Sequence, residues 1–156
     1  MQSAATNEQN EKFAELLAAA LLSRHSDAIV ATGHDGVIRF WNPGAERIFG
    51  YSREEAIGCS LDLIIPERLR QRHWDGFDKV MQSGQSRYGE SDLLAVPALR
   101  KDGATISVQF TIAMLRESGQ LVGMAAIIRD VTKQFQETRE LKRALSDLQA
   151  AAGGRS

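Results

Sequence analysis

The segment from Thr105 to Leu115 alternates apolar and polar residues. Its apolar members are Ile106, Val108, Phe110, Ile112 and Met114. Because successive side chains of a strand point to opposite faces, this period of two predicts a strand with one buried face. The almost uninterrupted apolar runs at 28–32 and 121–128 predict two further strands that are buried more completely.

Two weaker segments complete the set of expected strands. Residues 37–41 alternate after a turn centred on Asp35 and Gly36, which predicts the second strand of a hairpin. Residues 86–99 are irregular, and Pro97 belongs at a sheet edge or a bulge because it has no backbone N–H. The sequence therefore predicts five strands.

Residues 66–81 follow a helical period instead. Pro66 suits the first turn of a helix, where its missing N–H is no loss. The apolar stripe of this segment is formed by Leu69, His73, Phe77 and Val80, at spacings of four, four and three. One imidazole thus stands among apolar side chains. His73 is either a packed core histidine or a residue that faces a pocket and holds a ligand there.

Helical patterns also occupy both ends of the chain, at about 10–24 and 132–152, and two short helices are expected between 42 and 58. The complete order predicts an α+β fold, a five-stranded antiparallel sheet with helices on one face. We expect an N-terminal helix at 1–24, a central domain at 25–132 and a C-terminal helix at 133–156.

Composition narrows the functional classes. The chain has 156 residues, 43% of them hydrophobic and 25% charged, as in an ordinary globular domain. A net charge of −1 disfavours a broad nucleic-acid surface. No apolar run approaches the ~20 residues that a membrane span needs, and no secretory signal is visible. The single cysteine, Cys59, excludes an internal disulfide framework, so we expect a cytoplasmic protein.

Several motifs make the central segment resemble a PAS domain. They are the Asp35-Gly36 turn, W-N-P-G-A-E-R-I-F-G-Y at 41–51, E-E-A-I-G at 54–58, R-K-D-G at 100–103 and R-D-V-T at 129–132. The resemblance implies the PAS fold and a sensory role. It leaves the ligand open, because PAS domains hold haem, flavin, small acids or nothing.

His73 resembles the iron ligand of one group of these domains. In the haem-binding PAS domains of the FixL oxygen sensors and the direct oxygen sensor phosphodiesterases, a histidine follows a helix-opening proline by seven residues. His73 follows Pro66 by the same interval, with Arg70 also similar. The resemblance implies haem b (iron protoporphyrin IX) ligated by His73 and flanked by the apolar residues Leu69, Phe77 and Val80.

The other side of the expected pocket differs from that group. Leu93 or Leu94 takes the place where the FixL sensors carry an arginine, and neither leucine can donate a hydrogen bond to bound oxygen. Phe110 and Ile112, carried over by strand position, are expected to line the same side. The resemblance thus implies a sensor of a diatomic gas (O2, CO or NO) or of a redox state, and the apolar residues at these positions disfavour a tuned oxygen sensor. Met114 and Met124 are conceivable sixth ligands, although strand methionines more often fill a core.

Other functional classes stay open as alternatives. One is a PAS interaction module without a cofactor, with His73 packed in the core, and another is a flavin or small-metabolite sensor. Cys59 lies about two residues before the reactive position of flavin photoreceptors, which disfavours a photochemical adduct. No G-x-S-x-G, H-E-x-x-H, phosphate-binding loop or C-x-x-C motif occurs, so we expect no enzymatic activity. The terminal helices are expected to pair in a homodimer and to pass a signal to a downstream protein.

Overall fold

A computed structural model describes residues 2–85 and 94–154 of the chain. Five antiparallel strands form a single sheet in the order β2-β1-β5-β4-β3. The strands are β1 (Ala28–Gly33), β2 (Ile38–Trp41), β3 (Leu94–Leu99), β4 (Thr105–Glu117) and β5 (Gln120–Asp130). The expected five-stranded α+β fold is confirmed, and β5 is the central strand, as its apolar composition predicted. Pro97 lies in the edge strand β3, the kind of position that tolerates a residue without a backbone N–H.

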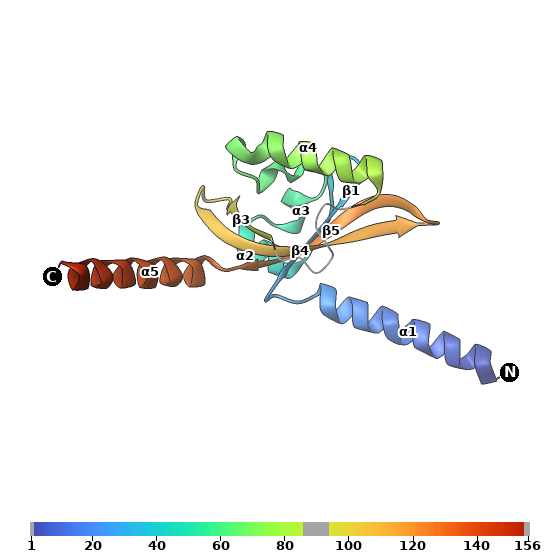
Figure 1. The fold of residues 1–156 in the computed structure, drawn as a ribbon. Helices are drawn as coiled ribbons and strands as arrows, with labels where there is room; N and C mark the ends of the chain where they lie inside the picture. Colours follow the sequence, from blue (N-terminus) through green and yellow to red (C-terminus); the bar gives the residue numbers. More distant parts are fainter. Residues whose placement is uncertain (1, 86–93, 155–156) are drawn as a thin grey trace.

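Four helical segments follow β2 and cover one face of the sheet (Figure 1). They are α2 (Pro43–Phe49), α3 (Arg53–Ala56), the 3-10 turn η1 (Leu61–Leu63) and α4 (Glu67–Ser83). Asn42 caps α2, and Ser52 forms a capping box with Glu55 at α3, as the sequence predicted. Helix α4 ends at Gly84, whose φ of 67° lies in the left-handed region that glycine adopts without strain.

The core lies between this helical layer and the inner face of the sheet. The largest fully buried side chains are Trp41, Phe49, Ile38, Ile48 and Asn42, which come from β2, from α2 and from the cap residue between them. On β4 the predicted alternation is confirmed at Ile106 and Val108, which are buried, while Ser107 between them is only half-buried. The core is therefore densest beneath α2 and thins toward the far end of β4.

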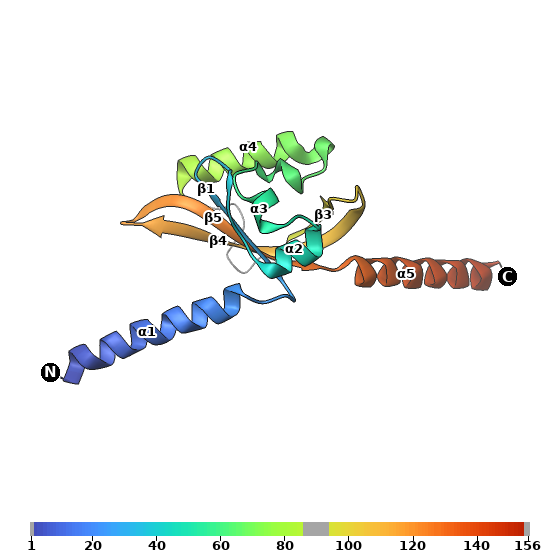
Figure 2. The ribbon, with the colours of Figure 1, turned by 180° about the vertical axis from the view of Figure 1, so that it is seen from behind.

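The terminal helices extend away from the sheet in different directions, as both views show (Figures 1 and 2). They are α1 (Gln2–Leu22) and α5 (Thr132–Gly153). Helix α1 begins eight residues before the expected start at Asn10, because residues 2–9 contain no proline or glycine to stop it. Within residues 2–85 and 94–154, no helix is long and apolar enough to cross a membrane.

Candidate functional site around His73

Helix α4 places His73 on its inward face, one turn before the buried Phe77. The two ring centroids lie 6.1 Å apart, and the neighbouring Trp74 meets the imidazole edge-on at 4.7 Å. Leu69 and Val80, which share the stripe, are half-buried. The helix therefore presents the predicted arrangement of one imidazole among apolar side chains.

Nδ1 of His73 is buried and has no hydrogen-bond partner among the described residues. Buried polar atoms are nearly always hydrogen-bonded, so an unpaired Nδ1 is unusual and shows that no hydrogen bond from the described residues holds the imidazole at this nitrogen. Burial lowers the pKa of His73 below its usual 6.5, while the negative charge of Asp62 raises it in part. The net lowering favours the neutral imidazole, which is the form that binds metal ions.

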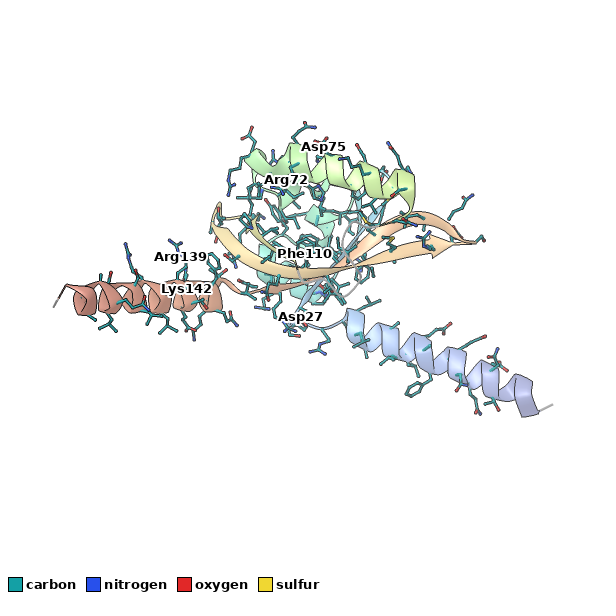
Figure 3. The ribbon with its side chains drawn as sticks, viewed as in Figure 1. Asp27, Arg72, Asp75, Phe110, Arg139 and Lys142 are labelled. Carbon is teal, nitrogen blue, oxygen red and sulfur yellow. The ribbon has the colours of Figure 1, made fainter. Side chains whose placement is uncertain are left out.

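The inner face of the sheet carries further apolar residues of the proposed site. Phe110 packs against the core from β4, and Ile112, two residues further along the same face, is half-buried. Their cross-strand partners on β5 are Ile128 and Ala126. Figure 3 labels Phe110 on β4 and shows Arg72 and Asp75 on α4, where both side chains are exposed to solvent. The inner face of β4 is thus apolar at Phe110 and Ile112, and their part in lining a pocket stays a prediction.

Side chains on this face of β4 become more accessible toward the β4–β5 hairpin. Ile106 and Val108 are buried, whereas Phe110, Ile112 and Met114 of the same face are only half-buried. The inner face of β4 is thus more accessible toward the hairpin than it is at Ile106 and Val108.

The remaining predicted site residues lie on β3, β4 and β5, apart from one that falls outside the described residues. Leu93 lies outside the described residues, and Leu94 is described only as the first residue of β3, paired with Phe110. Met114 and Met124 are direct partners across β4 and β5. The sulfur of Met114 lies 3.7 Å from Nη2 of Arg116, so this side chain already contacts the cationic end of its neighbour.

Two contacts near the site were not predicted from the sequence. Arg116 donates to the carbonyl of Gly84 and so joins the β4–β5 hairpin to the end of α4. Trp74 donates from Nε1 to Oδ1 of Asp62, at 2.7 Å. No sequence periodicity marks these pairs, because each bridges two elements whose relative placement depends on the complete fold.

The site offers few protein ligands for a metal ion. Among residues 2–85 and 94–154, no group of three or more His, Cys, Asp or Glu side chains is arranged to hold a metal ion. A haem iron needs less from the protein, because the porphyrin brings four nitrogen ligands and the chain supplies an axial one. A neutral, unpaired imidazole on an apolar wall fits that requirement, and the flanking apolar side chains fit a flat hydrophobic ring.

Comparison with known proteins identifies the domain. Residues 22–135 match the family described as the PAS fold. The oxygen sensor protein DosP of Escherichia coli is 33% identical over 125 residues, which are 78% of this chain and 15% of DosP. The sensor protein FixL of Bradyrhizobium diazoefficiens is 28% identical over 122 residues, 78% of this chain and 24% of FixL. The chain thus spans less than a quarter of the length of these two sensors.

Solved structures agree with this assignment. A PAS domain of a protein from Colwellia psychrerythraea superposes with a TM-score of 0.64 at 27% identity, covering 75% of this chain and 96% of that one. An RNA-binding light-oxygen-voltage receptor superposes with a TM-score of 0.65 at 18% identity, covering 83% of this chain and 36% of that one, and this shows likeness of fold alone. With most of its length matched by the family and its sheet order and helices in place, the chain belongs to the PAS family.

Proposed function

We propose that this PAS domain binds haem b through His73 and senses a diatomic gas (O2, CO or NO) or a redox state. The observation that carries the proposal is the imidazole of His73 among apolar and aromatic side chains, with its buried Nδ1 paired to no described residue. Relatives named as an oxygen sensor and as FixL support it, since each is about 30% identical over most of this chain. When bound, the haem iron supplies a coordination position for a small gas or an exchangeable electron.

The chain's own residues have distinct parts in this proposal. His73 would hold the iron through a ring nitrogen, while Leu69, Phe77 and Val80 would exclude water on its side. Phe110 and Ile112 are proposed to line the opposite side, to which the sequence resemblance also assigns Leu93 or Leu94. None of these four residue types carries a side-chain hydrogen-bond donor. An apolar wall of this kind favours ligands that need little hydrogen bonding, so CO or NO, or a redox signal, suits it better than O2.

The strand that bears Phe110 also contacts the start of α5. The N–H of Ser107 donates to Oγ1 of Thr132 at 3.0 Å, and the N–H of Val131 donates to the carbonyl of Ser107 at 2.8 Å. Phe110 is only three residues along β4 from Ser107, which is hydrogen-bonded to the start of α5. A displacement of β4 at Phe110 could therefore reach α5 directly. We propose that this connection transmits the signal to the terminal helices, a second copy of the chain and a downstream protein.

The domain itself is proposed to have no enzymatic activity, and a cytoplasmic location stays a prediction.

A second candidate function is a PAS interaction module without a cofactor. It is favoured by the apolar residues that α1 and α5 expose, among them Phe13 at 69% and Leu141 at 72%. A flavin or small-metabolite sensor is a third candidate, which uses the same interior without a metal ligand.

An absorption spectrum separates these candidates. The protein purified after expression with a haem supply, or reconstituted with haemin, is expected to show a Soret band that shifts on reduction and on addition of CO. His73→Ala is expected to lose the bound haem while its far-UV circular dichroism stays unchanged. Retention of haem with the same spectrum by His73→Ala would overturn the ligand assignment, and a colourless wild-type protein after reconstitution would favour the interaction module.

A further inference from the structure

Trp74 is held in place by two elements outside its own helix. Its indole Nε1 donates to Oδ1 of Asp62, in η1, at 2.7 Å. The benzene part of its ring lies against the turn between β1 and β2, where a β-carbon added to Gly36 would come within 2.3 Å of Cζ3. The ring is therefore fixed by a hydrogen bond at one edge and by backbone contact at the other.

The same ring is the closest aromatic neighbour of His73. The imidazole and indole centroids are 4.7 Å apart at an interplanar angle of 81°, and the indole also meets Phe77 edge-on at 5.2 Å. Phe77 lies 6.1 Å from the imidazole. His73 thus sits beside two aromatic rings that contact each other, which limits the rotation of the imidazole about its side-chain bonds.

No hydrogen bond from the described residues to Nδ1 fixes the orientation of the imidazole. Metal-binding histidines usually donate their second ring nitrogen to a carboxylate or a carbonyl, which fixes the ring orientation. In the described part of the chain, Nδ1 of His73 has no such partner. Asp62, the carboxylate whose charge acts on His73, accepts from Trp74 instead.

Asp62 is itself firmly anchored. Its backbone N–H donates to the hydroxyl of Ser60, and its carbonyl accepts from Nη2 of Arg70 at 3.3 Å. Nε of Arg70 donates to the carbonyl of Ile65 and lies 3.9 Å from Oδ1 of Asp62. The acceptor for the indole is therefore in place whether or not anything binds to His73.

We infer that Asp62 and Trp74 form a positioning pair that sets the direction in which the His73 imidazole points. In other metal-binding histidines a hydrogen-bond acceptor orients the ring, and here the indole ring of Trp74 does so by packing against it. The functional consequence of this inference rests on the proposed function: the orientation of His73 would set the strength and geometry of its bond to haem iron. The pair acts on the iron only through His73 and touches neither the metal nor its gas ligand.

Four variants of the full chain test the pair. Trp74→Phe keeps an aromatic ring but loses the N–H, and Asp62→Leu removes the acceptor. Asp62→Asn keeps a side-chain oxygen that can accept from the indole. Asp75→Asn changes an exposed carboxylate on the same helix, one residue beyond Trp74, and serves as the control.

Two measurements apply to each variant. In the haem-loaded ferrous protein, Trp74→Phe and Asp62→Leu are expected to shift or broaden the iron–histidine stretching band in the resonance Raman spectrum. They are also expected to raise the rate of haem transfer to apomyoglobin about tenfold, the usual scale for loss of a residue that orients a metal ligand. Asp62→Asn and Asp75→Asn are expected to resemble the wild type. An unchanged band and rate in both disruptive variants would overturn the inference.

The haem-free protein supplies an independent readout. Nuclear Overhauser contacts between the His73 and Trp74 rings are expected to define one imidazole orientation in the wild type and in Asp62→Asn, and more than one in Asp62→Leu. A single unchanged orientation in Asp62→Leu would overturn the positioning pair. If the wild type takes up no haem while these contacts are lost in Asp62→Leu, the proposed function fails and the positioning of His73 stands.

Discussion

The side-chain oxygen of Asn42 accepts a hydrogen bond from the backbone N–H of Ile29 at 2.7 Å, so the cap of α2 is also tied to β1. The same oxygen accepts from the N–H of Ala45 at 2.9 Å, and Nδ2 donates to the carbonyls of Arg24 and Asp27, each at 3.1 Å. Asn42 is only 1% exposed. One amide therefore joins the segment after α1, the strand β1 and the helix α2.

Asn42→Ala is expected to be strongly destabilising, because it removes these four hydrogen bonds and leaves buried backbone groups unpaired. A lost cap contributes about 1 kcal/mol and each buried unpaired group about 1–3 kcal/mol, so the free energy of unfolding should fall by about 3 kcal/mol. Urea denaturation measures this change. Asn7→Ala, at an exposed position in α1, is the control and should change it by less than about 0.5 kcal/mol. Equal values for the two variants would contradict this account of Asn42.

Local sequence signals identified much of this fold. Asn42-Pro43 and Ser52 with Glu55 indicated helix starts, and the period of two in β4 placed Phe110 and Ile112 on the inner face. These signals act over a few residues, where backbone geometry follows directly from side-chain chemistry. The hydrogen bond from Ile29 to Asn42 spans thirteen residues, and the bond from Trp74 to Asp62 spans twelve. Their partners are set by how the elements pack, which no short pattern encodes.

Gly36→Ala is expected to disturb the turn beneath Trp74. The position has a φ of 74°, which strains other residues, and its new β-carbon would overlap the indole ring. Gly58→Ala is the matched control, because its φ is 87° but nothing lies within 4 Å of the added carbon. The free energy of unfolding should fall by about 1 kcal/mol in both variants because of backbone strain. In Gly36→Ala it should fall by at least a further ~1 kcal/mol because of the clash. Equal losses would show that the indole moves aside freely.

Gly76→Ala is expected to stabilise the protein. Gly76 lies within α4, three residues after His73, at an exposed position where an added β-carbon meets nothing within 4 Å. Alanine is about 0.5–1 kcal/mol better than glycine inside a helix, since the unfolded chain loses less backbone freedom. The contrasting variant is Gly44→Ala in α2, where the new carbon would lie 1.9 Å from the carbonyl oxygen of Asp27. The midpoint temperature of thermal unfolding should rise for Gly76→Ala and fall for Gly44→Ala.

The haem-free protein is expected to lose stability as the pH falls below neutral. Burial lowers the pKa of His73 below 6.5 in the folded chain, with Asp62 opposing part of this effect. Between the folded pKa and about 6.5 the unfolded chain therefore binds more protons, and the free energy of unfolding declines as the pH decreases through the folded pKa. Urea denaturation at pH 7.5, 6.5 and 5.5 measures the slope. His73→Gln should show a shallower slope over this interval, and an identical slope would contradict a depressed pKa at His73.

Helix α5 is expected to pair with its counterpart in a second copy of the chain. Its apolar residues Leu141, Leu145 and Leu148 are between 56% and 72% exposed and follow a spacing of four and three, close to the seam of a coiled coil. Leu145→Glu places a charge in that seam and should convert a dimer to a monomer in light-scattering measurements. Ala144→Glu introduces the same charge one residue earlier, about 100° around the helix, and should leave the dimer intact. A monomeric wild-type protein at high concentration would remove the prediction, and dissociation by both variants would show that net charge, not the leucine seam, governs the association.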